Sequence, residues 1–332
     1  FHHHLHFILL QKFLKLIKID LRYKMPVITV NRNEVVQDID ILGSPLDYFR
    51  LMKPRVMSLV VFTAFVGFYI ATPIQGYSIH PLLACIGIFA IALGAGASGV
   101  LNQWYDRDID KVMIRTKDRP IPLGKILPSE ALSFGIISSI ISIMILGLAV
   151  NWLAASLLGF TIFFYAVVYT IWLKRNTVQN IVIGGAAGAF PPVIGQVCAT
   201  GNVALESVIL FMIIFLWTPP HFWALAIIRK EDYAAANIPM LPIVSGDKVT
   251  RKNILIYSCL LVPFSYMPWI LNYSGTAYLI IISLFGLEFL RKAILLYREK
   301  EGSEKSLFLY SIFYLSFIFA GICIDKFILN NY

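Results

Sequence analysis

Residues 102–122 read NQWYDRDIDKVMIRTKDRPIP, and they interrupt a chain that is otherwise mostly hydrophobic. Within this stretch an amide and two carboxylates, Asn102, Asp106 and Asp110, recur at every fourth position. Residues four apart lie on one face of an α-helix, so the spacing predicts three oxygen-bearing side chains stacked along one side. Such groups repel one another unless a cation lies between them. Because oxygen ligands favour hard cations, the stretch predicts a Mg²⁺ site of the kind that is shared with phosphates.

Basic side chains accompany these carboxylates, which suits a diphosphate. The candidate diphosphate contacts are Arg107, Lys111, Arg115, Arg119, Lys174 and Arg175. The alternative interpretation of residues 102–122 is a solvated loop of mixed charge between two membrane spans. The regular spacing and the Arg-Pro-Ile-Pro sequence at 119–122 argue against it. Lys174 and Arg175 end a hydrophobic segment, where cations also occur simply because they face the cytoplasm.

The composition is that of an integral membrane protein. Hydrophobic residues make up 58% of the chain and charged residues 14%, whereas a soluble domain has about 25% charged residues. Segments long enough to span a bilayer predict an all-α, polytopic fold with nine transmembrane helices. They lie at about 56–72, 81–101, 132–150, 152–173, 181–199, 206–228, 253–271, 275–296 and 307–328.

The distribution of positive charge predicts the orientation. With nine spans, 27 of the 28 Lys and Arg residues fall on one side of the membrane, and only Lys326 falls on the other. The positive-inside rule then places the N-terminus and the loops at 102–131, 174–180, 229–252 and 291–306 in the cytoplasm, with the C-terminus outside. The net charge of +9 is therefore explained without a nucleic-acid partner.

Two parts are expected in the chain: a cytoplasmic lead-in at 1–49 and the nine-helix domain at 50–332. Residues 6–24 are basic and amphipathic, which predicts an interfacial anchor helix. The equal alternative is that the natural protein begins at Met25, which leaves residues 1–24 outside it.

Further candidate site residues lie on the predicted cytoplasmic side or within the sixth span. Asp232 follows this span directly, and could face the carboxylates of the first loop across a shared site. His221 lies in Trp217-Thr-Pro-Pro-His-Phe-Trp223, where adjacent prolines should kink or break the helix. An ionisable group at that depth is a functional candidate, although a histidine bonded to a neighbouring helix is equally plausible. Arg50, Lys53 and Arg55 precede the first span and could meet an anionic substrate or lipid headgroups.

Over residues 45–328 the chain resembles the protohaem IX farnesyltransferases (haem O synthases), a branch of the UbiA-type intramembrane prenyltransferases. The resemblance rests on five pieces: 102–110, Arg-Pro-Ile-Pro at 119–122, Lys-Arg at 174–175 with 180–185, Trp-Thr-Pro-Pro-His-Phe-Trp-Ala at 217–224, and Asp-Tyr at 232–233 followed by Ile-Pro-Met-Leu-Pro at 238–242. Two departures are noted. Ala236 stands where many UbiA-type enzymes have a second Asp, and Asn237 replaces an expected Gly.

The resemblance implies nine helices around a central cavity, capped by two cytoplasmic loops. It implies haem B and farnesyl diphosphate as substrates and haem O and diphosphate as products, in a bacterial inner membrane or, in a eukaryote, the mitochondrial one. Asn102, Asp106, Asp110 and Asp232 would be catalytic and bind Mg²⁺, whereas His221, Arg50, Lys53 and Arg55 would contact haem. A haem A synthase or a terminal oxidase would use the product.

Two other functions are compatible with part of the pattern. One is a UbiA-type enzyme that prenylates an aromatic quinone precursor, against which the pieces at 217–224 and 238–242 argue. The other is a polytopic transporter or haem carrier, which would also place charged residues inside the membrane.

Overall fold

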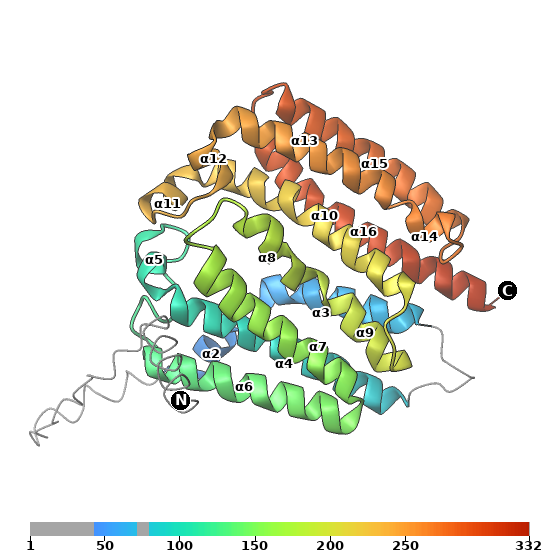
Figure 1. Ribbon diagram of the computed structural model, residues 1–332, viewed down its shortest axis with the longest axis horizontal. Coiled ribbons are helices and arrows are strands. Elements are labelled where there is room, and N and C mark those ends of the chain that lie inside the picture. The colour runs from blue at the N-terminus through green and yellow to red at the C-terminus, as the bar shows by residue number, and fades with distance from the viewer. Residues whose placement is uncertain (1–42, 72–79, 332) are drawn as a thin grey trace, which may run out of the picture. The chain divides into compact units, whose positions relative to one another are not determined.

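The computed structural model describes residues 43–71 and 80–331, and every regular element in these ranges is a helix (Figure 1). The helices are α2 (Pro45–Leu51), α3 (Pro54–Ile70), α4 (Pro81–Tyr105), α5 (Arg107–Val112), α6 (Pro128–Ala149), α7 (Trp152–Phe163), η3 (Phe164–Leu173), α8 (Asn180–Ala189), α9 (Pro191–Thr200), α10 (Leu205–Ile228), α11 (Lys230–Ala235), α12 (Leu241–Val244), α13 (Gly246–Phe264), α14 (Met267–Ile270), α15 (Thr276–Tyr297) and α16 (Ser303–Asn331). The predicted anchor helix and most of the lead-in lie outside the described residues.

The all-α membrane fold is confirmed, although the number of nine spans is not confirmed exactly. In the described ranges seven helical stretches are long and apolar enough to cross a membrane, or eight if α2 and α3 count as one span bent by 60°. The predicted segment at 275–296 is present as α15 but carries Glu288, Arg291 and Lys292 within two turns. These side chains pair with one another, Arg291 Nε lying 2.6 Å and Lys292 Nζ 3.3 Å from the Glu288 carboxylate.

Most of the helices pack as two groups around the two larger of three hydrophobic clusters, and α3 contributes to both of these. One cluster draws on α4, α6, α7 and α9 and includes Ala64 of α3. The other draws mainly on α10, α13, α15 and α16 and includes Val66 of α3. In Figure 1, α10, α13, α15 and α16 of the second group run from yellow to red, whereas α4, α6 and α7 of the first group are cyan to green.

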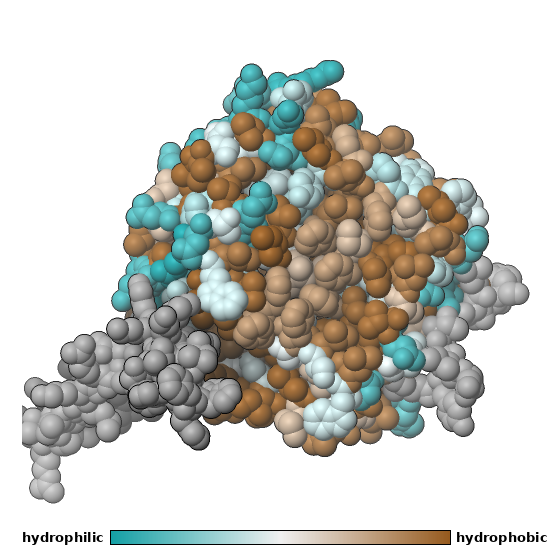
Figure 2. Space-filling model, viewed as in Figure 1, coloured by the Kyte–Doolittle hydropathy of each residue, from teal (hydrophilic) through white to brown (hydrophobic). Residues whose placement is uncertain are grey.

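Large hydrophobic side chains also cover the outside of the bundle. Leu148 of α6 is 72% exposed and Leu287 of α15 is 66% exposed. Figure 2 shows hydrophobic side chains across the middle of the visible face, with hydrophilic ones gathered along its edges. Exposed apolar surface on this scale marks a face that contacts lipid.

The paired prolines of α10 do not break the helix. α10 runs from Leu205 to Ile228 with Pro219 and Pro220 inside it. Proline residues are tolerated in a membrane helix because neighbouring helices and hydroxyl side chains satisfy the freed backbone groups. α10 remains one continuous helix through both prolines, so the structure shows no break at this point.

The tightest crossing in the bundle joins α3 to α9 through two glycines. A Cβ on Gly195 would lie 2.0 Å from the carbonyl oxygen of Ala64, and one on Gly67 would lie 2.0 Å from that of Pro192. Both obstacles are backbone atoms, which cannot rotate away. Small residues that let two membrane helices touch backbone to backbone are a general packing device.

We predict that Gly195→Ala destabilises the protein, because the new methyl group pushes α9 off α3. The expected cost is about 2–3 kcal/mol, typical of forced overpacking. The matched control is Gly188→Ala, since a Cβ at Gly188 of α8 meets nothing within 4 Å. Thermal unfolding in detergent should show a lower midpoint for Gly195→Ala and an unchanged or higher one for Gly188→Ala; equal midpoints would contradict the packing argument.

Candidate functional site

A buried polar pair, Asn102 and Asp106, lies where α4 ends. Asn102 Nδ2 donates to Asp106 Oδ2 at 2.8 Å, and the two residues are 4% and 0% exposed. Asp106 ends α4 with a backbone ψ of 4°, so α5 leaves in a new direction. The predicted stack of three is therefore interrupted. Asp110 lies beyond the break, and its Oδ2 accepts a hydrogen bond from Arg119 at 2.7 Å.

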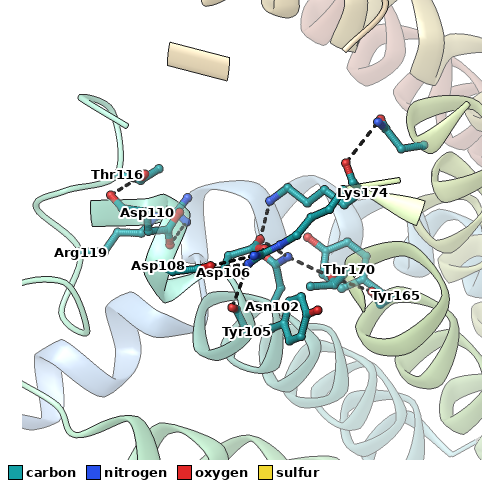
Figure 3. Close-up of polar contacts among 12 residues, drawn as sticks. Asn102, Tyr105, Asp106, Asp108, Asp110, Thr116, Arg119, Tyr165, Thr170 and Lys174 are labelled. Atoms are coloured by element: carbon teal, nitrogen blue, oxygen red, sulfur yellow. Dashed lines mark hydrogen bonds and ion pairs between the residues drawn. The ribbon is translucent and has the colours of Figure 1, made fainter. Parts of the chain in front are cut away.

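Three cationic side chains from other parts of the chain converge on this pair. Lys174 Nζ is ion-paired with Asp106 Oδ2, and Arg175 Nη2 lies 3.7 Å from Asp106 Oδ1. Lys53 Nζ donates to Asn102 Oδ1. Figure 3 shows Lys174 reaching from the end of η3 across to Asp106. A buried carboxylate needs such compensation; we call these five residues the carboxylate centre.

Arg175 ties the end of η3 to the start of α5. Its guanidinium forms two hydrogen bonds with Asp108, of 2.7 and 2.6 Å, and lies 4.8 Å above the ring of Tyr105. Partial burial alone would raise the pKa of the Asp108 carboxyl, but the hydrogen bonds and charge of Arg175 outweigh it, so this pKa lies below its usual value. Asp108 thus remains an anion that holds Arg175 beside Asp106.

Lys53 reaches the centre because the chain bends sharply between α2 and α3. Its backbone adopts a left-handed conformation, with φ 53° and ψ 55°, which is uncommon for a residue with a side chain. The bend is fastened to α4, since Gln103 Nε2 donates to the carbonyl of Leu51 at 2.7 Å. Strained backbone of this kind persists only where surrounding contacts enforce it.

In the structure Lys53 is therefore separated from Arg50 and Arg55, with which it was grouped as a haem contact. Arg50 pairs with Asp47 at 3.3 Å and has a 55% exposed side chain, and Arg55 is also exposed. Lys53 faces the carboxylates, whereas the other two face outward. The three residues that the sequence grouped as haem contacts therefore do not form one cluster.

Sequence reasoning missed Thr170, Tyr165 and Tyr169, which line the centre from η3. This element is a π-helix, in which the amide of Lys174 donates to the carbonyl of Tyr169 five residues earlier. Thr170 Oγ1 donates to the carbonyl of Tyr165 at 2.8 Å and accepts from Asn102 Nδ2 at 3.0 Å. A signal was present: Thr170 is a polar residue in an apolar span, one turn before Lys174.

Asp232 joins the second loop to the first. It is 7% exposed on α11, and its Oδ1 accepts a hydrogen bond from the amide of Ile114 at 3.1 Å. Its other oxygen, Oδ2, is buried without a hydrogen-bond partner. The loops at 102–131 and 229–252 thus meet, although four predicted spans separate them in sequence.

The remaining basic candidates are not drawn into the centre. Lys111 and Arg115 are exposed. Arg107 begins α5 and contacts Trp104, near the end of α4. Its guanidinium lies 5.5 Å from the centroid of the Trp104 ring, and its Nη1 donates to the carbonyl of that residue at 2.8 Å.

His221 occupies a different place, on the face of α10 that meets α16. It is 8% exposed, and its Nδ1 lies 2.6 Å from Ser311 Oγ. No local pattern singles out Ser311, because it lies 90 residues from His221 in a long apolar helix.

In the described part of the chain no three His, Cys, Asp or Glu side chains are grouped as a ready-made metal cage. Two carboxylate oxygens are nevertheless buried without hydrogen-bond partners, Asp106 Oδ1 and Asp232 Oδ2. Arg175 lies 3.7 Å from Asp106 Oδ1 and offsets its charge, but neither oxygen receives a hydrogen bond, and a buried oxygen without one is costly unless a ligand supplies it. The donor set of amide and carboxylate oxygens suits a hard divalent cation that keeps part of its water shell.

Comparison with known proteins agrees with this geometry. The UbiA prenyltransferase family matches residues 60–318. A protoheme IX farnesyltransferase of Rhizobium johnstonii is 54% identical over 289 residues, covering 86% of this chain and 90% of that protein. Protoheme IX farnesyltransferase 2 of Mesorhizobium japonicum is 56% identical over 285 residues, covering 84% and 90%.

Two solved structures share the fold. A structure of digeranylgeranylglyceryl phosphate synthase superposes with a TM-score of 0.70 at 21% identity, covering 84% of this chain and 97% of that one. A UbiA homologue from Archaeoglobus fulgidus bound to GPP and Mg²⁺ gives a TM-score of 0.57 at 17% identity, covering 83% and 99%. With the family match extending over most of the helices and relatives above half identity, the chain belongs to the UbiA prenyltransferase family.

Proposed function

We propose that the protein transfers the farnesyl group of farnesyl diphosphate to a vinyl group of haem B, with addition of water, giving haem O and diphosphate. The observation that carries this proposal is the carboxylate centre, a buried cluster of opposite charges at the end of membrane-spanning helices. The proteins named protoheme IX farnesyltransferase, at 54% and 56% identity, support haem as the acceptor.

The basic side chains of the centre bind the diphosphate. Lys174 and Arg175 already lie at Asp106, and Arg119 lies at Asp110 on the adjoining loop. We add Lys53 to this group, because its Nζ donates to Asn102 Oδ1, and Asn102 is in turn bonded to Asp106. Lys111 and Arg115, which are exposed on the loop, and Arg107 meet the diphosphate as it approaches. Fixed cations of this kind stabilise the negative charge that develops on a leaving group.

Asn102, Asp106, Asp110 and Asp232 are the residues that would hold Mg²⁺, and the two orphaned carboxylate oxygens support this assignment. The Archaeoglobus fulgidus homologue was solved with GPP and Mg²⁺. Bound Mg²⁺ supplies positive charge that makes diphosphate a better leaving group.

The rest of the site protects the farnesyl cation. Cleavage of the allylic C–O bond leaves both electrons on diphosphate, and the cation is then attacked by the vinyl π-bond. Water captures the new cationic carbon and loses a proton, which leaves a hydroxyl group. The rings of Tyr165 and Tyr169 are stacked with centroids 5.4 Å apart beside the centre, where their π-faces stabilise a cation and exclude water.

We further propose that the centre lies on the cytoplasmic side of an inner membrane. The distribution of Lys and Arg supports this orientation. Arg50 and Arg55, exposed at the start of α3, would meet the haem propionates near the membrane surface. A haem A synthase or terminal oxidase would receive the product.

The proposal is tested by mass spectrometry of haem extracted from membranes that express the chain. Wild-type protein should yield the hydroxyethylfarnesyl adduct, and Asp106→Asn should reduce it about 100-fold or more, because a central anion is lost. Asp118→Asn, an exposed residue of the same loop, is the matched control and should behave as wild type. Full adduct yield from Asp106→Asn would contradict the role given to Asp106, and absence of the adduct from wild-type membranes would contradict farnesyl transfer to haem and favour a transporter. Prenylation of an aromatic quinone precursor in place of haem would identify the other acceptor.

Removal of divalent metal should abolish turnover by the purified protein. We expect chelation by EDTA to stop diphosphate release and added Mg²⁺ to restore it, since the orphaned oxygens of Asp106 and Asp232 then regain a partner. The measurement is diphosphate released per minute from farnesyl diphosphate and haem B. Undiminished release in the chelated sample would rule out the metal assignment.

Lys53 is expected to act on the diphosphate substrate. Loss of one charge-assisted hydrogen bond in Lys53→Met should raise KM for farnesyl diphosphate about tenfold, with KM for haem unchanged. Lys53→Arg should recover part of the loss, and Arg55→Met, on an exposed neighbour, should leave KM for farnesyl diphosphate unaltered. A rise in KM for haem alone would instead indicate that Lys53 contacts the haem propionates.

A further inference from the structure

His221 is held rigidly in an aromatic sandwich between α10 and α16. Its ring stacks on Trp217 with centroids 4.3 Å apart and planes at 17°, and on Phe308 at 4.8 Å and 25°. Trp217 is fixed in turn, because its Nε1 donates to the carbonyl of Ser311 at 2.7 Å. The imidazole therefore has little freedom to tilt or rotate.

The contacts of Ser311 determine which nitrogen of His221 carries the proton. Ser311 Oγ lies 2.7 Å from the carbonyl oxygen of Phe308, which can only accept, so the single hydroxyl hydrogen points there. The same oxygen lies 2.6 Å from His221 Nδ1 and must accept from it. Nδ1 thus bears the hydrogen, and in the neutral ring Nε2 carries the lone pair.

This lone pair has no partner in the described part of the chain. No side-chain or backbone group there donates to Nε2, and the atom is not sealed from solvent as the buried orphan atoms are. A histidine kept only for packing normally has both nitrogens satisfied. An imidazole whose Nδ1 is fixed by a hydrogen bond and whose Nε2 is open is the usual arrangement of a histidine that ligates a metal.

We infer that His221 Nε2 is the axial ligand of the haem iron, and that Ser311 is the positioning residue that fixes the ligating tautomer. The inference rests on the proposed function, since it takes haem B as the substrate. Iron lies at the centre of the macrocycle and the vinyl groups at its edge, so ligation anchors the acceptor without covering the reacting carbon. Neutral imidazole is a common protein ligand of haem iron.

The test is a titration of the purified full-length protein with ferric haem B alone, followed by absorption and electron paramagnetic resonance spectra. In every variant His2, His3, His4 and His6 are changed to Ala, so that these terminal residues cannot bind iron. We expect a histidine-ligated spectrum for this background. His221→Ala should lose it and bind haem at least about tenfold more weakly, and added imidazole should restore the spectrum.

Two further variants make the outcome specific. His221→Met should fold and replace the histidine spectrum by that of a thioether ligand. Ser311→Ala should keep histidine ligation but weaken haem binding about tenfold, because the tautomer is no longer fixed. His80→Ala, which changes an exposed histidine at the start of α4, is the control and should leave the spectrum unchanged.

An unchanged iron spectrum in both His221→Ala and His221→Met would overturn the inference. That result would leave the proposed function standing as long as the wild-type protein still makes the farnesylated haem. Absence of that product from wild-type protein that binds haem through His221 would instead contradict the proposed function.

Discussion

The burial of the Asp106 carboxylate is the constraint on which the rest of the site depends. A fully buried anion is strongly destabilising unless cations and hydrogen-bond donors surround it. Here the compensation comes from distant parts of the chain: Asn102 one turn earlier, Lys174 from η3 and Arg175 beside it. Because the fold must bring these cations to Asp106, it also concentrates positive charge at a place where a diphosphate could bind.

The sequence predicted those features that depend on spacing and composition. Apolar length predicted the membrane helices, and the i, i+4 spacing of Asn102 and Asp106 predicted their contact, because both are properties of a single helix. Single-helix arguments became inaccurate where tertiary contacts decide. Asp110 leaves the stack because α4 ends at Asp106, and α10 stays continuous through its two prolines because it is packed among other helices.

Other site features have no local signature at all. Lys53 points to the carboxylates because Gln103 fastens the bend before α3, a contact across 52 positions of sequence. Nothing in the order of Arg50, Lys53 and Arg55 distinguishes the one cation that turns inward from the two that face outward. Ser311 likewise becomes a candidate site residue only because it contacts His221, which lies 90 residues earlier on another helix. Pairings of this kind require the tertiary structure.

In the proposed reaction, the two halves of the bundle divide the chemistry between them. The carboxylate centre is built mainly on α4 and η3, whose spans belong to the group of helices that includes α6 and α9. His221 and Ser311 lie on α10 and α16, which belong to the other group. The prenyl donor is anionic at one end and needs fixed cations, while the acceptor is a flat apolar ring that needs aromatic stacking and a ligand for iron. Because α3 packs against both groups, and Lys53 directly precedes it, a shift of one half relative to the other would change the distance between donor and acceptor. Close backbone packing at Gly67 and Gly195 fixes α3 against α9, and so against the group that carries the carboxylate centre.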